Sequence, residues 1–226
     1  MRTILLATIA TAALSATSAF AQPAPPASVV IVHGLPGGDL QQPAELPVDI
    51  SVDGSCALTR VAYRSIIGPL SLPPGTRRIA VHYPATGTCA SAAAIGPAAV
   101  PFFSGENATV IAHVGPDGRP TASKFVNNVS AMPAGRARAA IHHTANAPQV
   151  DVYLTRAFGS PLQTTALTTG LTPGEQTVTP VAGDAQQFAI TAAGASAAAF
   201  GPVGLNLSAN YIFSFYVVGS LTNGTL

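Results

Sequence analysis

Residues 138–154 read Arg-Ala-Ala-Ile-His-His-Thr-Ala-Asn-Ala-Pro-Gln-Val-Asp-Val-Tyr-Leu, two short apolar runs joined by a polar segment that contains proline. Such runs, rich in Val, Ile and aromatic residues and bounded by Asn, Asp, Pro and Gly, are typical of β-strands. The first run has a counterpart in residues 29–33 (Val-Val-Ile-Val-His), and the second in residues 47–52 (Pro-Val-Asp-Ile-Ser-Val). The sequence therefore predicts the same strand–loop–strand unit twice.

Three further segments recur in the same order, at residues 72–75 and 171–174, 95–97 and 200–202, and 107–115 and 210–219. Matched segments in a constant order indicate an internal duplication. Short strands that are separated by glycine and proline turns are typical of a β-sandwich. We predict an all-β protein of two tandem immunoglobulin-like antiparallel β-sandwich domains, at residues 22–130 and 137–226, joined by a linker at residues 131–136.

The first 21 residues predict a signal peptide. Arg2 precedes an apolar run at residues 4–14, and Ala19-Phe20-Ala21 has the small residues that a signal peptidase requires. The apolar run is shorter than the ~20 residues of a membrane-spanning helix. We expect cleavage after Ala21, export to the periplasm, the cell surface or the medium, and no integral membrane segment in the mature protein.

Charged residues make up only 8% of the chain, whereas 48% of it is hydrophobic. A typical soluble domain has about 25% charged residues. A nearly neutral protein of this kind lacks the basic surface that nucleic acid requires, so no nucleic-acid partner is expected. It also has little charge repulsion to keep copies apart. The composition favours self-association or contact with envelope or surface components.

Two cysteines, Cys56 and Cys89, both lie in the first copy. In an oxidising compartment, two cysteines in one small domain predict a disulfide. A bond that closes a loop of this size stabilises a domain by about 3–4 kcal/mol. Two buried free thiols are the alternative.

Histidine and aspartate recur together in the two copies, as His33 with Asp49 and as His142 with Asp151. A hydrogen-bonded pair of this kind can orient an imidazole for base catalysis or metal binding. Alternatively, the two residues pin adjacent strands, with the aspartate accepting hydrogen bonds from a loop. We favour the structural interpretation.

Other candidate metal ligands lie in the first copy. His33, His82 and His113 are the residue type that zinc and copper prefer, provided that the three side chains converge. Asp39, Glu45, Asp49 and Asp53 offer oxygens of the kind that calcium binds, without the spacing of an EF-hand. We expect these residues to be scattered polar groups, and no cofactor is predicted.

Residues 140–154 resemble the opening signature of the DUF4397 family, a "VVHASPDAPAVDVYV"-like stretch. Val61-Ala62-Tyr63 and residues 72–76 resemble the later "VAFG"-like and "PAGTY"-like elements of that family. The resemblance implies a secreted or surface-associated β-sandwich, often in tandem, with no established activity. The first copy departs from the pattern, because a longer loop at residues 34–46 replaces the compact family loop.

No motif of a known catalytic or cofactor site is present, since HExxH, a P-loop, GxGxxG, GxSxG and CxxC are all missing from the sequence. We therefore predict a non-enzymatic, exported structural or interaction module, adhesion-like, of the cell envelope or surface. One alternative is a subunit of an extracellular filament or matrix that assembles by β-strand addition. Another is a metal or small-ligand binding protein that uses the histidines of the first copy.

Overall fold

The computed structural model describes residues 22–156, 164–221 and 223–226, so the predicted signal peptide lies outside the described residues. The first half of the chain contains eight strands and a short 3-10 helix at Gly37–Leu40. The strands are β1 (Ala27–Gly34), β2 (Val48–Val52), β3 (Ser55–Val61), β4 (Ile66–Leu72), β5 (Gly75–His82), β6 (Ala93–Phe102), β7 (Asn107–Val114) and β8 (Pro120–Val126).

The second half contains seven strands among the described residues. They are β9 (Arg136–His143), β10 (Val150–Arg156), β11 (Thr164–Leu171), β12 (Glu175–Ala182), β13 (Ala185–Ala192), β14 (Ala198–Asn206) and β15 (Ile212–Val217). None of the described residues forms a helix with the length and apolar character needed to cross a membrane.

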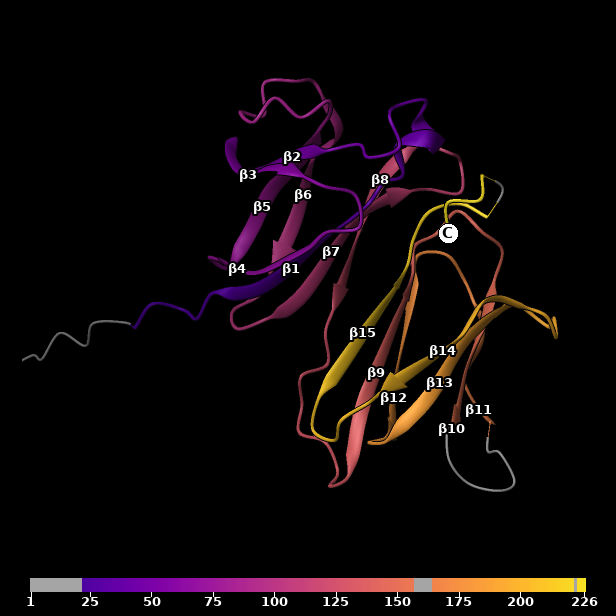
Figure 1. The fold of residues 1–226 in the computed structure, drawn as a ribbon. Helices are drawn as coiled ribbons and strands as arrows, with labels where there is room; N and C mark the ends of the chain where they lie inside the picture. Colours follow the sequence, from indigo (N-terminus) through magenta and orange to yellow (C-terminus); the bar gives the residue numbers. More distant parts are fainter. Residues whose placement is uncertain (1–21, 157–163, 222) are drawn as a thin grey trace, which may run out of the picture.

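The strands form four sheets, two in each half (Figure 1). In the first half the orders are β4-β1-β7-β8 and β3-β2-β5-β6, and in the second they are β12-β9-β15 and β11-β10-β13-β14. The predicted all-β sandwich is confirmed. The pairing is not purely antiparallel, because β1 runs parallel to β7 and β9 runs parallel to β15. Each of these pairs joins two strands that are far apart in the chain. Parallel neighbours need such a long connection, because a short hairpin can join only antiparallel strands.

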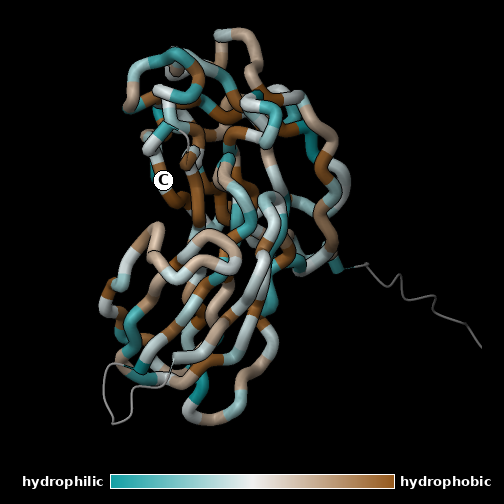
Figure 2. Tube along the Cα trace, turned by 90° about the vertical axis from the view of Figure 1, so that its right-hand side faces the viewer, coloured by the Kyte–Doolittle hydropathy of each residue, from teal (hydrophilic) through white to brown (hydrophobic). Residues whose placement is uncertain are grey.

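Each half has its own hydrophobic core, and hydrophobic positions recur along the strands of both halves (Figure 2). In β1 the core residues are Ala27, Val29 and Ile31, and in β9 they are Ala137, Ala139 and Ile141. This spacing of two places alternate side chains on the inner face. That the halves are two independent, immunoglobulin-like domains stays a prediction.

The two halves contact each other through the outer faces of the sheets that contain β1 and β9. Val32, Ile111 and Phe125 of the first half form a separate buried cluster, against which Tyr216 and Val218 of the second half pack. At the margin, the Gln176 side chain donates a hydrogen bond to the Val126 carbonyl. We call this contact the inter-half interface.

The second half repeats the strand order of the first with one exception. Strands β9 to β15 correspond in order and pairing to β1 to β7, but none of the described residues forms a counterpart of β8. In the first half β8 pairs with β7 and completes a four-stranded sheet. In the second half β15 is therefore the last strand of its sheet.

One of the matched sequence segments is not equivalent in the fold. Residues 72–75 connect β4 to β5, whereas residues 171–174 connect β11 to β12, which correspond to β3 and β4. The counterpart of β5 is β13, so His82, which pairs with Asp49, corresponds to Thr191, which pairs with Asp151. The two Leu-x-Pro-Gly segments are alike because both make tight turns.

Candidate functional site

Asp49 is a fully buried carboxylate that accepts backbone hydrogen bonds from two directions. Its Oδ1 accepts from Arg60 N at 2.8 Å, and its Oδ2 accepts from Thr86 N and Gly87 N at 2.8 Å and from Cys89 N at 3.2 Å. Burial raises the pKa of Asp49, but the four backbone hydrogen bonds together lower it by more than burial raises it. The pKa therefore lies below its ordinary value. Asp49 thus fixes the loop between β5 and β6.

The predicted disulfide is confirmed, since Cys56 of β3 is bonded to Cys89 of the same loop, with their Cα atoms 5.5 Å apart. The two sulfurs and the Asp49 carboxylate form a group of potential metal ligands. Because both sulfurs are in the disulfide, neither is a thiolate that would bind a metal. The disulfide and the carboxylate hold the same loop.

Asp151 has the corresponding role in the second half. It accepts hydrogen bonds from Gly194 N at 2.8 Å and from Gly170 N at 2.7 Å, and these bonds lower its pKa. Among the described residues neither aspartate is hydrogen-bonded to a histidine side chain, so the hypothetical hydrogen-bonded pairs His33–Asp49 and His142–Asp151 are not formed.

The structural counterpart of His33 is His143 and not His142. His33 Nε2 donates to the Leu46 carbonyl at 2.7 Å, and His143 Nε2 donates to the Pro148 carbonyl at 3.0 Å. Both acceptors lie three residues before the buried aspartate of their half. The sequence match that pairs His33 with His142 is thus one residue out of register, which moves the side chain to the other face of the strand.

His142 lies on the outer face of β9, in the inter-half interface. Its ring stacks on Tyr216, with centroids 4.9 Å apart, and meets the edge of Phe125 at 4.9 Å. The side chain is fully buried, and neither of its ring nitrogens has a hydrogen-bond partner among the described residues. This burial lowers its pKa to about 4. His142 is therefore a neutral, apolar-packed residue at ordinary pH.

We expect His142 to make stability depend on pH. Between pH 6.5 and about 4, the unfolded chain binds a proton at this residue and the folded chain does not, so stability falls with decreasing pH across this range. Across the whole range the loss of stability from this residue is roughly 3 kcal/mol. Urea unfolding at pH 7 and pH 4.5 should show a smaller loss for His142→Phe than for the wild type. An equal loss in the two proteins would contradict this prediction.

The three histidines proposed as metal ligands do not converge. His82 bonds to the Ser91 carbonyl at 2.7 Å and to Ser51 Oγ at 2.9 Å, and His113 bonds to Ser123 Oγ at 2.9 Å. Each ring, including that of His33, has separate partners. The acidic residues are also divided, because Asp39 contacts Asn223 and Thr225 whereas Asp53 contacts Arg77 and Arg78. The geometry favours neither metal hypothesis.

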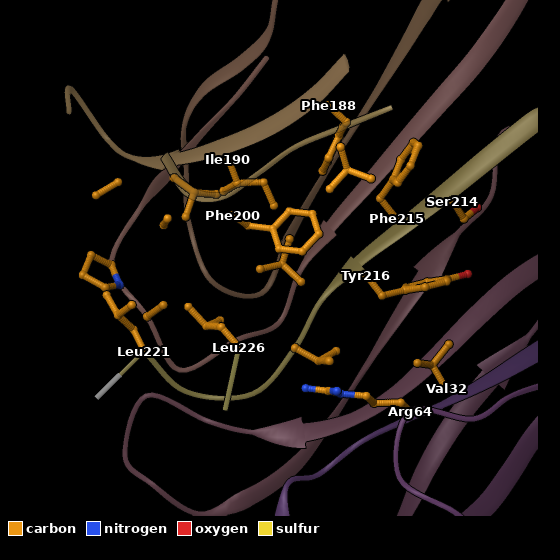
Figure 3. A pocket seen from close by; sticks show the side chains of 18 of the residues that line it. Val32, Arg64, Phe188, Ile190, Phe200, Ser214, Phe215, Tyr216, Leu221 and Leu226 are labelled. Atoms are coloured by element: carbon orange, nitrogen blue, oxygen red, sulfur yellow. The ribbon is translucent and has the colours of Figure 1, made fainter. Parts of the chain in front are cut away.

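A large apolar cleft opens at the edge of the second half, with a volume of about 540 Å³ (Figure 3). Phe188, Phe200 and Phe215 form its inner wall, and the Phe188 and Phe215 rings stack with centroids 4.7 Å apart. Val32 and Ile66 of the first half form the opposite side. Phe200 and Ile66 are 52% and 60% exposed. Arg64, at the margin, is the one Lys, Arg, Asp or Glu residue among the lining residues.

The free edge of β15 borders this cleft. Residues 214–218 line it, and no described strand pairs with the edge of β15 that faces away from β9. No local pattern in the sequence predicts the cleft, because the residues that line it come from segments that lie far apart in the chain.

The model of the DUF4397 family, a domain of unknown function, matches residues 27–153, which extend from the start of β1 into β10. The chain belongs to the DUF4397 family. The match is one continuous segment.

Among solved structures, the chain is similar to "The Bacillus anthracis TIE protein", with 10% sequence identity and a TM-score of 0.25. The similarity covers 86% of this chain and 34% of the other, so the chain spans about a third of that protein's length. No curated protein matches the chain.

Proposed function

We propose that this DUF4397 protein is an exported, non-enzymatic interaction module of the cell envelope or surface, and that it binds through the cleft of its second half. The observation that carries this proposal is the exposed apolar surface of the cleft, where Phe200, Val203 and Ile66 are all more than 40% exposed. Contiguous apolar surface of this kind is typical of interaction sites.

Two further observations support parts of this proposal. The Cys56–Cys89 disulfide favours an oxidising compartment, as expected for an exported protein. The histidines and buried aspartates, the residues that would serve an enzyme, hold backbone groups of loops or lie packed between aromatic rings. These contacts support a structural role for them.

The cleft can be tested by placing a charge in its wall. We expect Phe200→Asp to weaken binding of the purified protein to envelopes isolated from its source organism by roughly tenfold or more, because an apolar contact would bury an unpaired carboxylate. Val129→Asp is the matched control, since Val129 is 57% exposed and does not line the cleft. A co-sedimentation assay measures both.

The result has three informative outcomes. Loss of binding in Phe200→Asp alone supports the proposal. Equal binding of wild type and both variants would show that the cleft is not the interaction surface. If the wild type itself binds no envelope component, the proposed function is wrong.

A further inference from the structure

Three sheet edges end at the cleft. They belong to β4 of the first half and to β14 and β15 of the second half, each of which is the last strand of its sheet. Ile66 of β4, Val203 of β14 and Ser214 of β15 all line the cleft. Sheet edges that carry exposed apolar side chains are sites where another chain can add a strand.

The backbone of β15 shows which of its residues face the free edge. Arg138 N donates to the Tyr211 carbonyl at 3.0 Å, and Thr144 N donates to the Val217 carbonyl at 2.9 Å. Because successive residues of a strand direct their backbone groups to opposite sides, the odd-numbered residues of β15 face β9. The N–H and C=O groups of Ile212, Ser214 and Tyr216 therefore point outward.

The first half shows how such an edge is completed. There β8 runs antiparallel to β7, pairing Ile111 with Ser123 and Thr109 with Phe125. Thr109 and Ile111 correspond to Ser214 and Tyr216, because β1 pairs with β7 as β9 pairs with β15. The backbone N–H and C=O groups that point outward from β15 thus correspond to the groups of β7 that form hydrogen bonds with β8.

The inter-half interface is also incomplete on this side. A four-stranded sheet of the first half meets a three-stranded sheet of the second half, with β8 next to β9 and β12 through Phe125 and Val126. Val32 and Tyr216 belong both to this interface and to the cleft. One further strand beside β15 would continue the interface and cover Ile66 on the outer face of β4.

We propose that β15 of a second copy covers this edge, paired antiparallel across a twofold axis at Ser214. This inference goes beyond the proposed function, because the partner that it names at the free edge of β15 is a second copy of the chain. The outward residues are symmetrical about Ser214, so Ile212 of each copy lies opposite Tyr216 of the other, an aliphatic–aromatic pair that stabilises sheets. Arg64 is the one Lys, Arg, Asp or Glu residue among the described residues that line the cleft, so little charge repulsion opposes the pairing.

Cross-linking tests the predicted register. Hydrogen-bonded residues that face each other across antiparallel strands have Cα atoms about 5.5 Å apart, within the range for a disulfide. We expect oxidised Ser214→Cys to form mostly disulfide-linked dimers. Thr165→Cys, an exposed position on the edge strand β11, is the control and should remain monomeric. Equal cross-linking of the two variants would overturn the proposal.

Sedimentation equilibrium tests the pairing without a new cysteine. Ser214→Lys places like charges at the axis, and Ser214→Pro removes an N–H that the single chain does not use. Each should weaken dimerisation by roughly tenfold or more. Ser214→Thr keeps the N–H and should remain dimeric. If circular dichroism shows that Ser214→Pro does not fold, the result for Ser214→Lys alone tests the proposed dimer.

The two proposals fail differently. A wild-type chain that is monomeric at about 1 mM overturns the dimer but leaves cleft-dependent envelope binding intact. A dimer that Ser214→Lys disrupts, in a protein whose envelope binding is unchanged by Phe200→Asp, overturns the proposed function and supports the dimer.

Discussion

Asp49→Ala is expected to lower the free energy of unfolding by about 3–5 kcal/mol. The substitution leaves the backbone N–H groups of Arg60, Thr86, Gly87 and Cys89 without their acceptor, at a position where the side chain is fully buried. Buried donors that lose a partner incur the cost of their desolvation, which exceeds the net gain from an ordinary hydrogen bond.

Urea denaturation at pH 7 measures this loss, with Asp49→Asn as the matched variant. The amide has the same shape and keeps one acceptor oxygen, so it should be less destabilising than alanine. Asp53→Ala serves as a surface control, because Asp53 is a partly exposed turn residue that pairs with Arg77. If Asp49→Ala is no less stable than Asp53→Ala, the assigned role of Asp49 is wrong.

Removal of the disulfide by Cys56→Ser with Cys89→Ser is expected to cost about 3–4 kcal/mol. The cysteines are 33 residues apart in sequence, so the bond restricts a long loop in the unfolded chain. Cys89 N also donates a hydrogen bond to Asp49, so the disulfide and the Asp49 carboxylate both hold the loop between β5 and β6. Their effects should be coupled by about 0.5–3 kcal/mol in a double-mutant cycle.

Thermal and urea unfolding of the wild type with and without reductant provide an independent measurement of the same quantity. Reduction should reproduce the loss seen in the double serine variant and should have no effect on that variant. A wild-type protein whose stability is unchanged by complete reduction would contradict the prediction. Additive effects of Asp49→Ala and the serine variant would show that the two do not act on one segment.

The sequence was sufficient for the features that depend on local pattern. Alternating apolar residues and Gly/Pro turns predicted an all-β sandwich, the two cysteines predicted their bond, and residues 140–154 indicated the DUF4397 family. The predicted correspondence between the two halves is wrong where it depends on the exact register of a strand. The sequence pairs His33 with His142, but His143 is the residue that bonds to the carbonyl three residues before the buried aspartate.

That failure has a physical reason. The period of a strand is two, so both neighbouring histidines of β9 fit the apolar pattern, and only contacts with residues distant in sequence decide which one faces the core. His143 meets the Pro148 carbonyl on the inner side, whereas His142 meets Phe125 and Tyr216 on the outer side. The sequence cannot separate them, because these partners come from other strands.

The apolar runs of residues 138–154 and their counterparts at residues 29–33 and 47–52 thus determined by themselves that the chain folds into strands twice over. The tertiary structure alone decided how those strands pair. It left β15 with a free edge beside an apolar cleft, because the place that β8 takes in the first half has no described counterpart in the second. Strand order depends on contacts between distant segments, and no local pattern encodes it.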